Sequence, residues 1–140
     1  MSLAFEDVAV GDVLPESSRR VTRADVKAYA DASGDQNPLH QDDAVARAAG
    51  FPGVIAHGMF TMGHLASALI AWAGDAGTIL RMRVQFRAPV LVGETIVAGG
   101  SVKELDPEHR TATLDVWVRV ERDGGVEWPI RRSEADIRLG

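Results

Sequence analysis

The stretch "FPGVIAHGMFTMGHLASALIAWAGDAG", residues 51–77, is the most apolar part of the 140-residue chain. From Gly58 to Ala73, nearly every side of a helical wheel carries an apolar or small residue. The exceptions are Thr61, His64 and Ser67. A helix that is apolar all round is a buried helix, and at about 1.5 Å per residue this one would extend roughly 24 Å. The sequence therefore predicts a long central helix that other elements enclose.

The residues after this helix have the alternation of β-strands. In "ILRMRVQFRAP", residues 79–89, apolar residues at 80, 82, 84, 86 and 88 alternate with Arg81, Arg83, Gln85 and Arg87. This pattern predicts a half-buried strand with one basic face. A second strand is predicted over residues 94–105, where Gly99–Gly100 suggests a bend or a bulge.

Two more strands are predicted at the end of the chain, over residues 111–121 and 126–139. They follow the turn "DPEHR" and are joined to each other by "RDGG", a typical hairpin turn. The apolar positions change parity within the last strand, so a bulge is expected near Pro129–Arg132.

The residues before the central helix predict short elements. A first strand is expected within residues 13–21, and Thr22 with Asp25 forms a capping box for a helix that ends at Ser33–Gly34. A second short helix is expected from an aspartate cap to Gly50. The most economical packing is an antiparallel curved sheet wrapped around the long central helix. The predicted fold class is therefore α+β, a single hot dog domain over residues 1–140.

Composition and charge exclude several functions. Hydrophobic residues make up 46% of the chain and charged residues 25%, the formal net charge is −5, and there are no cysteines. The negative charge argues against nucleic acid as a partner, and the missing cysteines exclude disulfides and thiolate nucleophiles. No apolar run approaches the ~20 residues of a membrane span, and the first residues lack the pattern of a signal peptide, so a cytoplasmic location is expected.

The stretch "DASGDQNPLH", residues 31–40, contains the strongest candidate for chemistry. Asp35 and His40 lie at the two ends of a turn built from Asn37 and Pro38, and both can transfer protons. Asn tolerates turn conformations and Pro fixes φ, so these residues would hold the loop in one shape. The pattern indicates a general acid/base pair.

A resemblance to a known family supports this interpretation. "SGDQNPLHQD" (33–42) followed by "AGFPGVIAHGMFTMG" (49–63) resembles the signature of the MaoC-like (R)-specific enoyl-thioester hydratases and dehydratases, and "RVQFRAPVLVGETI" (83–96) is similar to the family's strand after the helix. The resemblance covers essentially the whole chain. Within the family, the chain most resembles the catalytic B-type subunit of the two-component mycobacterial (3R)-hydroxyacyl-carrier-protein dehydratases.

The resemblance implies reversible hydration of trans-2-enoyl thioesters, carried by CoA or an acyl-carrier protein, to (3R)-hydroxyacyl thioesters. Asp35 and His40 can share one water, although the sequence does not assign a proton to either. The backbone N–H of Gly58, at the start of the helix, is an unpaired donor; the resemblance implies that it stabilises the enolate oxygen. Asn37, His57 and Thr61 are candidates for substrate binding.

No metal site and no cofactor beyond the thioester carrier are predicted. His57 and His64 are separated by about 10 Å along the helix axis, too far for both to bind one zinc ion. Arg81, Arg83 and Arg87 form either a solvated face or an attractive surface for the phosphates of CoA or an acidic carrier protein. The resemblance implies a dimer, either a homodimer or a heterodimer with another hot dog subunit.

Two other functions remain possible on the same fold. A hot dog thioesterase would direct water to the carbonyl carbon and release free thiol. A non-catalytic subunit would bind acyl chains or stabilise a partner, and the presence of both Asp35 and His40 argues against it.

Overall fold

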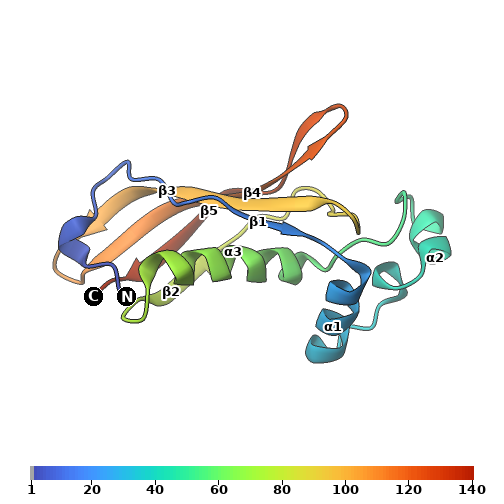
Figure 1. Ribbon diagram of the computed structural model, residues 1–140, viewed down its shortest axis with the longest axis horizontal. Coiled ribbons are helices and arrows are strands. Elements are labelled where there is room, and N and C mark those ends of the chain that lie inside the picture. The colour runs from blue at the N-terminus through green and yellow to red at the C-terminus, as the bar shows by residue number, and fades with distance from the viewer. Residues whose placement is uncertain (1) are drawn as a thin grey trace.

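The computed structural model describes residues 2–140 and contains a five-stranded antiparallel sheet that curls around one long helix (Figure 1). The sheet order is β1-β3-β4-β5-β2. The helices are α1 (Arg23–Ser33), α2 (Asp43–Ala48) and α3 (Gly58–Ala73), with short 3₁₀ helices η1 (Phe5–Asp7) and η2 (Pro38–His40). The strands are β1 (Ser17–Arg20), β2 (Thr78–Arg83), β3 (Thr95–Asp106), β4 (Thr111–Arg122) and β5 (Gly125–Arg138). The predicted hot dog fold is confirmed.

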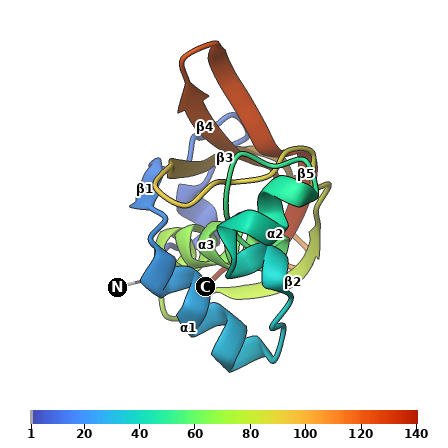
Figure 2. The same ribbon diagram turned by 90° about the vertical axis from the view of Figure 1, so that its right-hand side faces the viewer.

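The central helix α3 has the bounds that the sequence predicts, and it packs on the inner face of the sheet. Leu65 and Leu69 are fully buried in the same apolar core as Leu114 and Ile137. Full burial of such a side chain stabilises the fold by about 1.5–3 kcal/mol. Viewed from the right-hand side of Figure 1, α3 is seen along its axis beneath the sheet, and α1 and α2 lie toward the viewer, at its N-terminal end (Figure 2).

The prediction that α3 is enclosed on all sides is wrong. Met59 is 54% exposed and Ile70 is 58% exposed. The sheet covers one side of the helix, so the opposite flank faces outward with its apolar residues uncovered. Among residues 2–140, none of the helices combines the length and the apolar character that a membrane span requires.

The strand after α3 is shorter than predicted. β2 ends at Arg83, and its pairing with β5 shifts register between Ile79 and Arg81. An extra residue in one strand restarts the alternation of faces, so Ile79 packs against the core while Leu80 is 49% exposed. The predicted apolar face is therefore wrong at Leu80, and also at Phe86, which is 51% exposed.

The two glycines of β3 do not form a bulge, which is one of the two features that the sequence suggests for them. Gly99 pairs with Trp117 and Gly100 with Val116 in regular register, and the shift in pairing comes later, between Val102 and Glu104. Their role is close packing: a Cβ at residue 99 would overlap the indole of Trp117, and one at residue 100 would overlap the main-chain carbonyl oxygen of Asp115.

Several local predictions are confirmed. Thr22 and Asp25 form a reciprocal capping box at the start of α1, which ends at Ser33 with Gly34 in the left-handed conformation (φ 81°). The pairing of β4 with β5 shifts register on both sides of Ile130, and Arg132 has a φ of 54°, which places the bulge where the parity changes.

The packing around Gly100 predicts a stability difference. A Cβ there meets backbone, which cannot rotate away, so Gly100→Ala should lower the free energy of unfolding by about 1–3 kcal/mol. Gly124→Ala is the matched control, because the space around Gly124 is open, and should change it by less than ~0.5 kcal/mol. Urea denaturation measures both values, and equal stability of the two variants would contradict the packing role.

Candidate active site

The loop after α1 is held by a series of local hydrogen bonds. The hydroxyl of Ser33 accepts the N–H of Asp35 (3.1 Å), and Asp35 Oδ1 accepts the N–H of Asn37 (3.2 Å). Asn37 Oδ1 in turn accepts the N–H of Leu39 (3.0 Å) and caps η2. Each polar side chain thus satisfies the amide two residues ahead. Asn37 therefore shapes the loop, and its side-chain oxygen is engaged within it.

His40 lies at the end of η2, with a defined tautomer. Its Nδ1 is 2.7 Å from the carbonyl oxygen of Ile55. Because a carbonyl oxygen can only accept, Nδ1 carries the hydrogen, and Nε2 of the neutral ring has the free lone pair. That lone pair gives His40 a proton acceptor that the main chain does not occupy.

His57 connects the loop to the start of α3. The side chain is 3% exposed, its Nε2 lies 3.0 Å from the main-chain oxygen of Asp35, and its ring stacks on His40 with centroids 3.8 Å apart. The Nδ1 atom is buried and has no hydrogen-bond partner among residues 2–140. One side-chain oxygen of Asp35 and one ring nitrogen each of His40 and His57 lie within 4.8 Å of one another. The structure therefore brings the two predicted proton-transfer groups together.

His40 opens onto a cavity of about 360 Å³ at the N-terminal end of α3. Gly58 and Thr61 line it from the helix, and Phe86 and Arg87 from the segment after β2. The remaining lining residues are Phe51, Ile55, Ala56, Ala88, Pro89, Val90 and Pro129. A mostly apolar cavity with a few convergent polar groups is typical of small-molecule sites.

The helix start supplies a hydrogen-bond donor to this cavity. His57 is the N-cap residue, in extended conformation, and its side chain makes no capping hydrogen bond. The first N–H groups of an α-helix have no partner within the helix, and the helix dipole makes this end favourable for negative charge. The amide of Gly58 is thus suited to an anionic oxygen, and Thr61, which is 3% exposed, lies one turn further along the same wall.

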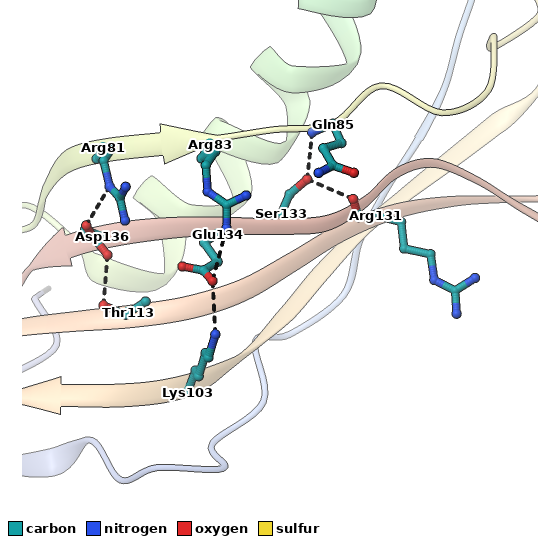
Figure 3. Close-up of polar contacts among 9 residues, drawn as sticks. All are labelled: Arg81, Arg83, Gln85, Lys103, Thr113, Arg131, Ser133, Glu134 and Asp136. Atoms are coloured by element: carbon teal, nitrogen blue, oxygen red, sulfur yellow. Dashed lines mark hydrogen bonds and ion pairs between the residues drawn. The ribbon is translucent and has the colours of Figure 1, made fainter.

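The structure separates the three arginines that the sequence grouped. Arg81 pairs with Asp136 (2.9 Å) and Arg83 with Glu134 (3.2 Å). Figure 3 shows these ion pairs on the side of the strands turned away from α3. Lys103 also binds Glu134, at 3.0 Å, and it is the main cause that lowers the pKa of this carboxyl. The charges on this face are therefore paired with one another.

Arg87 has a different environment. It lines the cavity, and its guanidinium donates to the side-chain oxygen of Gln85 (2.9 Å). Within residues 2–140, no carboxylate forms a salt bridge with Arg87. Of the three predicted cations, Arg87 is the one that lines the cavity.

An ion pair fixes the wall of the cavity that follows Phe86. Glu94 accepts hydrogen bonds from Leu91 N–H (2.7 Å) and from Arg122 (2.6 and 2.8 Å), and Arg122 also donates to the carbonyl oxygen of Pro89 (2.7 Å). Burial raises the pKa of Glu94. The hydrogen bonds from Arg122 and Leu91, together with the charge of Arg122, lower it by more than burial raises it, so the pKa of Glu94 lies below its ordinary value of 4.5. The segment from Pro89 to Glu94 is thereby held to β4.

Sequence reasoning missed Phe86 and the Glu94–Arg122 pair as parts of this site. Phe86 alternates in phase with apolar residues of the predicted strand, and this pattern assigned it to the core. Glu94 and Arg122 are 28 residues apart, and no local pattern joins them.

Two groups of residues in the described part of the chain have the ligand types and spacing for a metal ion. They are Asp35, His40 and His57, and Asp106, Glu108 and His109. In the first group, His40 Nδ1 and His57 Nε2 are already bonded to main-chain oxygens. The sequence predicts that the site works without a metal ion, and this stays a prediction.

Comparison with known proteins identifies relatives over the whole chain. Residues 6–124 match the family described as "MaoC like domain". A 3-hydroxybutyryl-CoA dehydratase of Methylorubrum extorquens is 34% identical, over 99% of this chain and 93% of its own length. The solved (R)-hydratase of Aeromonas caviae, involved in PHA biosynthesis, is 31% identical, with a TM-score of 0.85 over 96% of this chain and 99% of its own.

Other solved relatives are longer or more distant. A MaoC-like dehydratase is 38% identical with a TM-score of 0.88, and this chain spans 43% of its length. The ChsH1-ChsH2 complex of Mycobacterium tuberculosis includes a chain with a TM-score of 0.83 and 20% identity, covering 94% of this chain and 98% of its own; the likeness shows the fold alone.

The ion pair at the cavity wall predicts a pH-dependent stability. Because the pKa of Glu94 is lowered in the folded state, its contribution is present above about pH 4.5 and is lost as the pH falls through the lowered value. Glu94→Gln should lower the free energy of unfolding at pH 7 by about 1–3 kcal/mol, and the difference from the wild type should shrink below about pH 4.5.

Glu16→Gln is the matched control for this prediction. Glu16 also pairs with an arginine, Arg119, but its side chain is 48% exposed compared with 16% for Glu94. Its loss should affect stability less, because solvent screens exposed pairs. Denaturation of all three proteins between pH 3 and pH 8 measures the effect, and a constant difference across that range would contradict it.

Proposed function

This chain belongs to the MaoC-like domain family, and we propose that Asp35, His40 and the N–H of Gly58 perform its reaction. The chain is a hydro-lyase that reversibly converts trans-2-enoyl thioesters to (3R)-hydroxyacyl thioesters. Its relatives include a dehydratase of 3-hydroxybutyryl-CoA and an (R)-hydratase, which act on the two sides of one equilibrium. The observation that carries the residue assignment is the convergence of Asp35 and His40 beside the start of α3.

The proposed reaction begins with a water held between Asp35 and His40. Asp35 Oδ1 accepts the amide of Asn37, which leaves Oδ2 for the water, and His40 offers the lone pair of Nε2. As the water oxygen bonds to C3, one proton of the water passes to the pair, and the pair supplies a proton to C2. Each positioned proton-transfer group typically accelerates such a step by ~10²–10⁴-fold.

The amide of Gly58 stabilises the charge that develops during this step. Attack at C3 moves electron density through C2 to the thioester oxygen, which becomes an enolate. A preorganised N–H directed at that oxygen acts as an oxyanion hole does. The hydroxyl of Thr61 lies on the same wall of the cavity and can contact the same part of the substrate. The reaction in this form requires no cofactor besides the CoA or phosphopantetheine that carries the acyl group.

We also propose that the chain associates with another hot dog subunit. β1 and β2 are the two edges of the sheet, and the exposed flank of α3 carries Met59 and Ile70. Unpaired strand edges and uncovered apolar residues favour association. The ChsH1-ChsH2 complex has two components and shares this fold, which supports a hot dog partner. The partner is either an identical chain or a different hot dog subunit.

Replacing either member of the pair should abolish most of the activity. Asp35→Asn and His40→Gln should each lower kcat/KM for a short trans-2-enoyl-CoA by at least ~100-fold, because each removes one proton-transfer group. Loss of enoyl absorbance measures hydration, and free thiol is measured in parallel. Unchanged melting temperatures would show that the fold survives. Near-normal rates in both variants would contradict the assignment, and stoichiometric thiol release by the wild type would indicate a thioesterase.

Arg87 should affect binding of the carrier more than the chemical step. A guanidinium without an acidic partner at the cavity can bind phosphate through charge-assisted hydrogen bonds. Arg87→Ala should therefore raise KM for the CoA thioester about tenfold, equivalent to about 1.4 kcal/mol, and reduce its dependence on salt. Arg81→Ala is the control, because Arg81 is paired with Asp136 on the far face of the sheet. Equal increases in KM for the two variants would refute a specific role for Arg87.

A further inference from the structure

Phe86 lies where regular strand pairing stops. β2 ends at Arg83, and Phe86 contacts the sheet through a single bridge to Ile130. The amide of Gln85 donates to the hydroxyl of Ser133 (2.9 Å) and that of Arg87 donates to the carbonyl oxygen of Pro129 (2.8 Å). The backbone on both sides of Phe86 is thus fixed, while half of the residue is exposed at the edge of the cavity.

The ring of Phe86 packs directly against Gly58. Its Cε1, Cδ1 and Cζ atoms lie 3.2, 3.3 and 3.4 Å from the position that a Cβ would take at residue 58. These distances are at or below ordinary van der Waals contact, so the ring fills the space that a side chain at residue 58 would need. Glycine at this position leaves room for the aromatic ring beside the amide that starts α3.

The ring of Phe86 lies close to the substrate atoms that the Gly58 amide would hold, an inference that rests on the proposed function. When the thioester oxygen accepts the N–H of Gly58, the two atoms bonded to the carbonyl carbon lie within a few Å of that amide: the sulfur and C2. C2 faces the Asp35–His40 pair, because it receives the proton. His40 comes from the loop before α3 and Phe86 from the segment after β2, and both line the cavity, so the wall that carries Phe86 is distinct from the one that carries His40.

We propose that Phe86 is a specificity-determining residue that excludes substituents at C2. The enzyme acts on enoyl thioesters that carry hydrogen at C2 and discriminates against those with a methyl group there. A methyl group must displace the ring, which is in close contact with Gly58, or move the carbonyl oxygen away from the amide. One added or missing methylene in an apolar pocket changes kcat/KM by about 10–200-fold, which is the range expected here.

The test compares two substrates in two proteins. kcat/KM is measured for trans-2-butenoyl-CoA and for (E)-2-methyl-2-butenoyl-CoA, with the wild type and with Phe86→Ala. The intrinsic difference in reactivity between the substrates is common to both proteins and cancels in the comparison. The preference for the unbranched substrate should fall at least ~10-fold in Phe86→Ala, mainly because the branched substrate reacts faster. Phe86→Leu, which retains an apolar side chain, should give an intermediate preference and serves if the alanine variant does not fold.

Phe51→Ala is the matched control. Phe51 lines the same cavity, whereas the three nearest atoms to a Cβ at residue 58 all belong to Phe86. Truncation of Phe51 enlarges the cavity but keeps the ring that packs against Gly58, so it should leave the preference between the two substrates unchanged even if the rates for both fall.

The outcomes separate this inference from the proposed function. A wild type that does not hydrate trans-2-butenoyl-CoA or any longer unbranched homologue would refute the proposed function and this inference with it. A wild type that hydrates the unbranched substrate, together with a Phe86→Ala variant of unchanged preference, would overturn the role of Phe86 alone. An equal loss of preference in Phe51→Ala would also overturn it, because the effect would then be one of cavity size.

Discussion

The site depends on one constraint: an apolar helix has to be covered along its length while its first amides stay unpaired. The curled sheet covers one side of α3 through residues such as Leu65 and Leu69. The N-terminal end of α3 faces α1 and α2 (Figures 1 and 2). Unpaired N–H groups are costly in an apolar interior, so this end has to meet water or a polar ligand. The cavity at Gly58 satisfies that requirement, and it makes the helix end available for chemistry.

Two kinds of interaction bring Asp35 and His40, the proposed proton-transfer groups, to this helix end. The loop between α1 and η2 is shaped locally, because Ser33, Asp35 and Asn37 each bind an amide two residues ahead. Its position relative to α3 depends on longer connections, from His40 to Ile55 and from His57 to Asp35. His57 is buried and stacks on His40, so one side chain connects the loop, the imidazole of His40 and the helix start.

The sequence predicts the features that depend on neighbours along the chain. The capping box at Thr22, the end of α1 at Gly34 and both bounds of α3 follow from local patterns, and all agree with the structure. The uncovered flank of α3 could not be predicted in this way, since a helical wheel gives hydrophobicity but not the reach of the sheet. The same limit applies to Gly99 and Gly100. Both a bulge and a close approach favour glycine, and the partner strand decides which one applies.

The segment after α3 shows why local sequence patterns do not predict part of the site. Alternation over residues 79–88 placed Arg81, Arg83 and Arg87 together on one face. The shift in register near Ile79 and the end of β2 at Arg83 break that alternation. While the strand is paired, acids of β5 lie beside its arginines and bind them. Beyond Arg83 the chain lines the cavity, and both Phe86 and Arg87 form part of its wall. The departure from regular pairing is therefore what supplies this wall of the site with an aromatic ring and with a cation that forms no ion pair within residues 2–140.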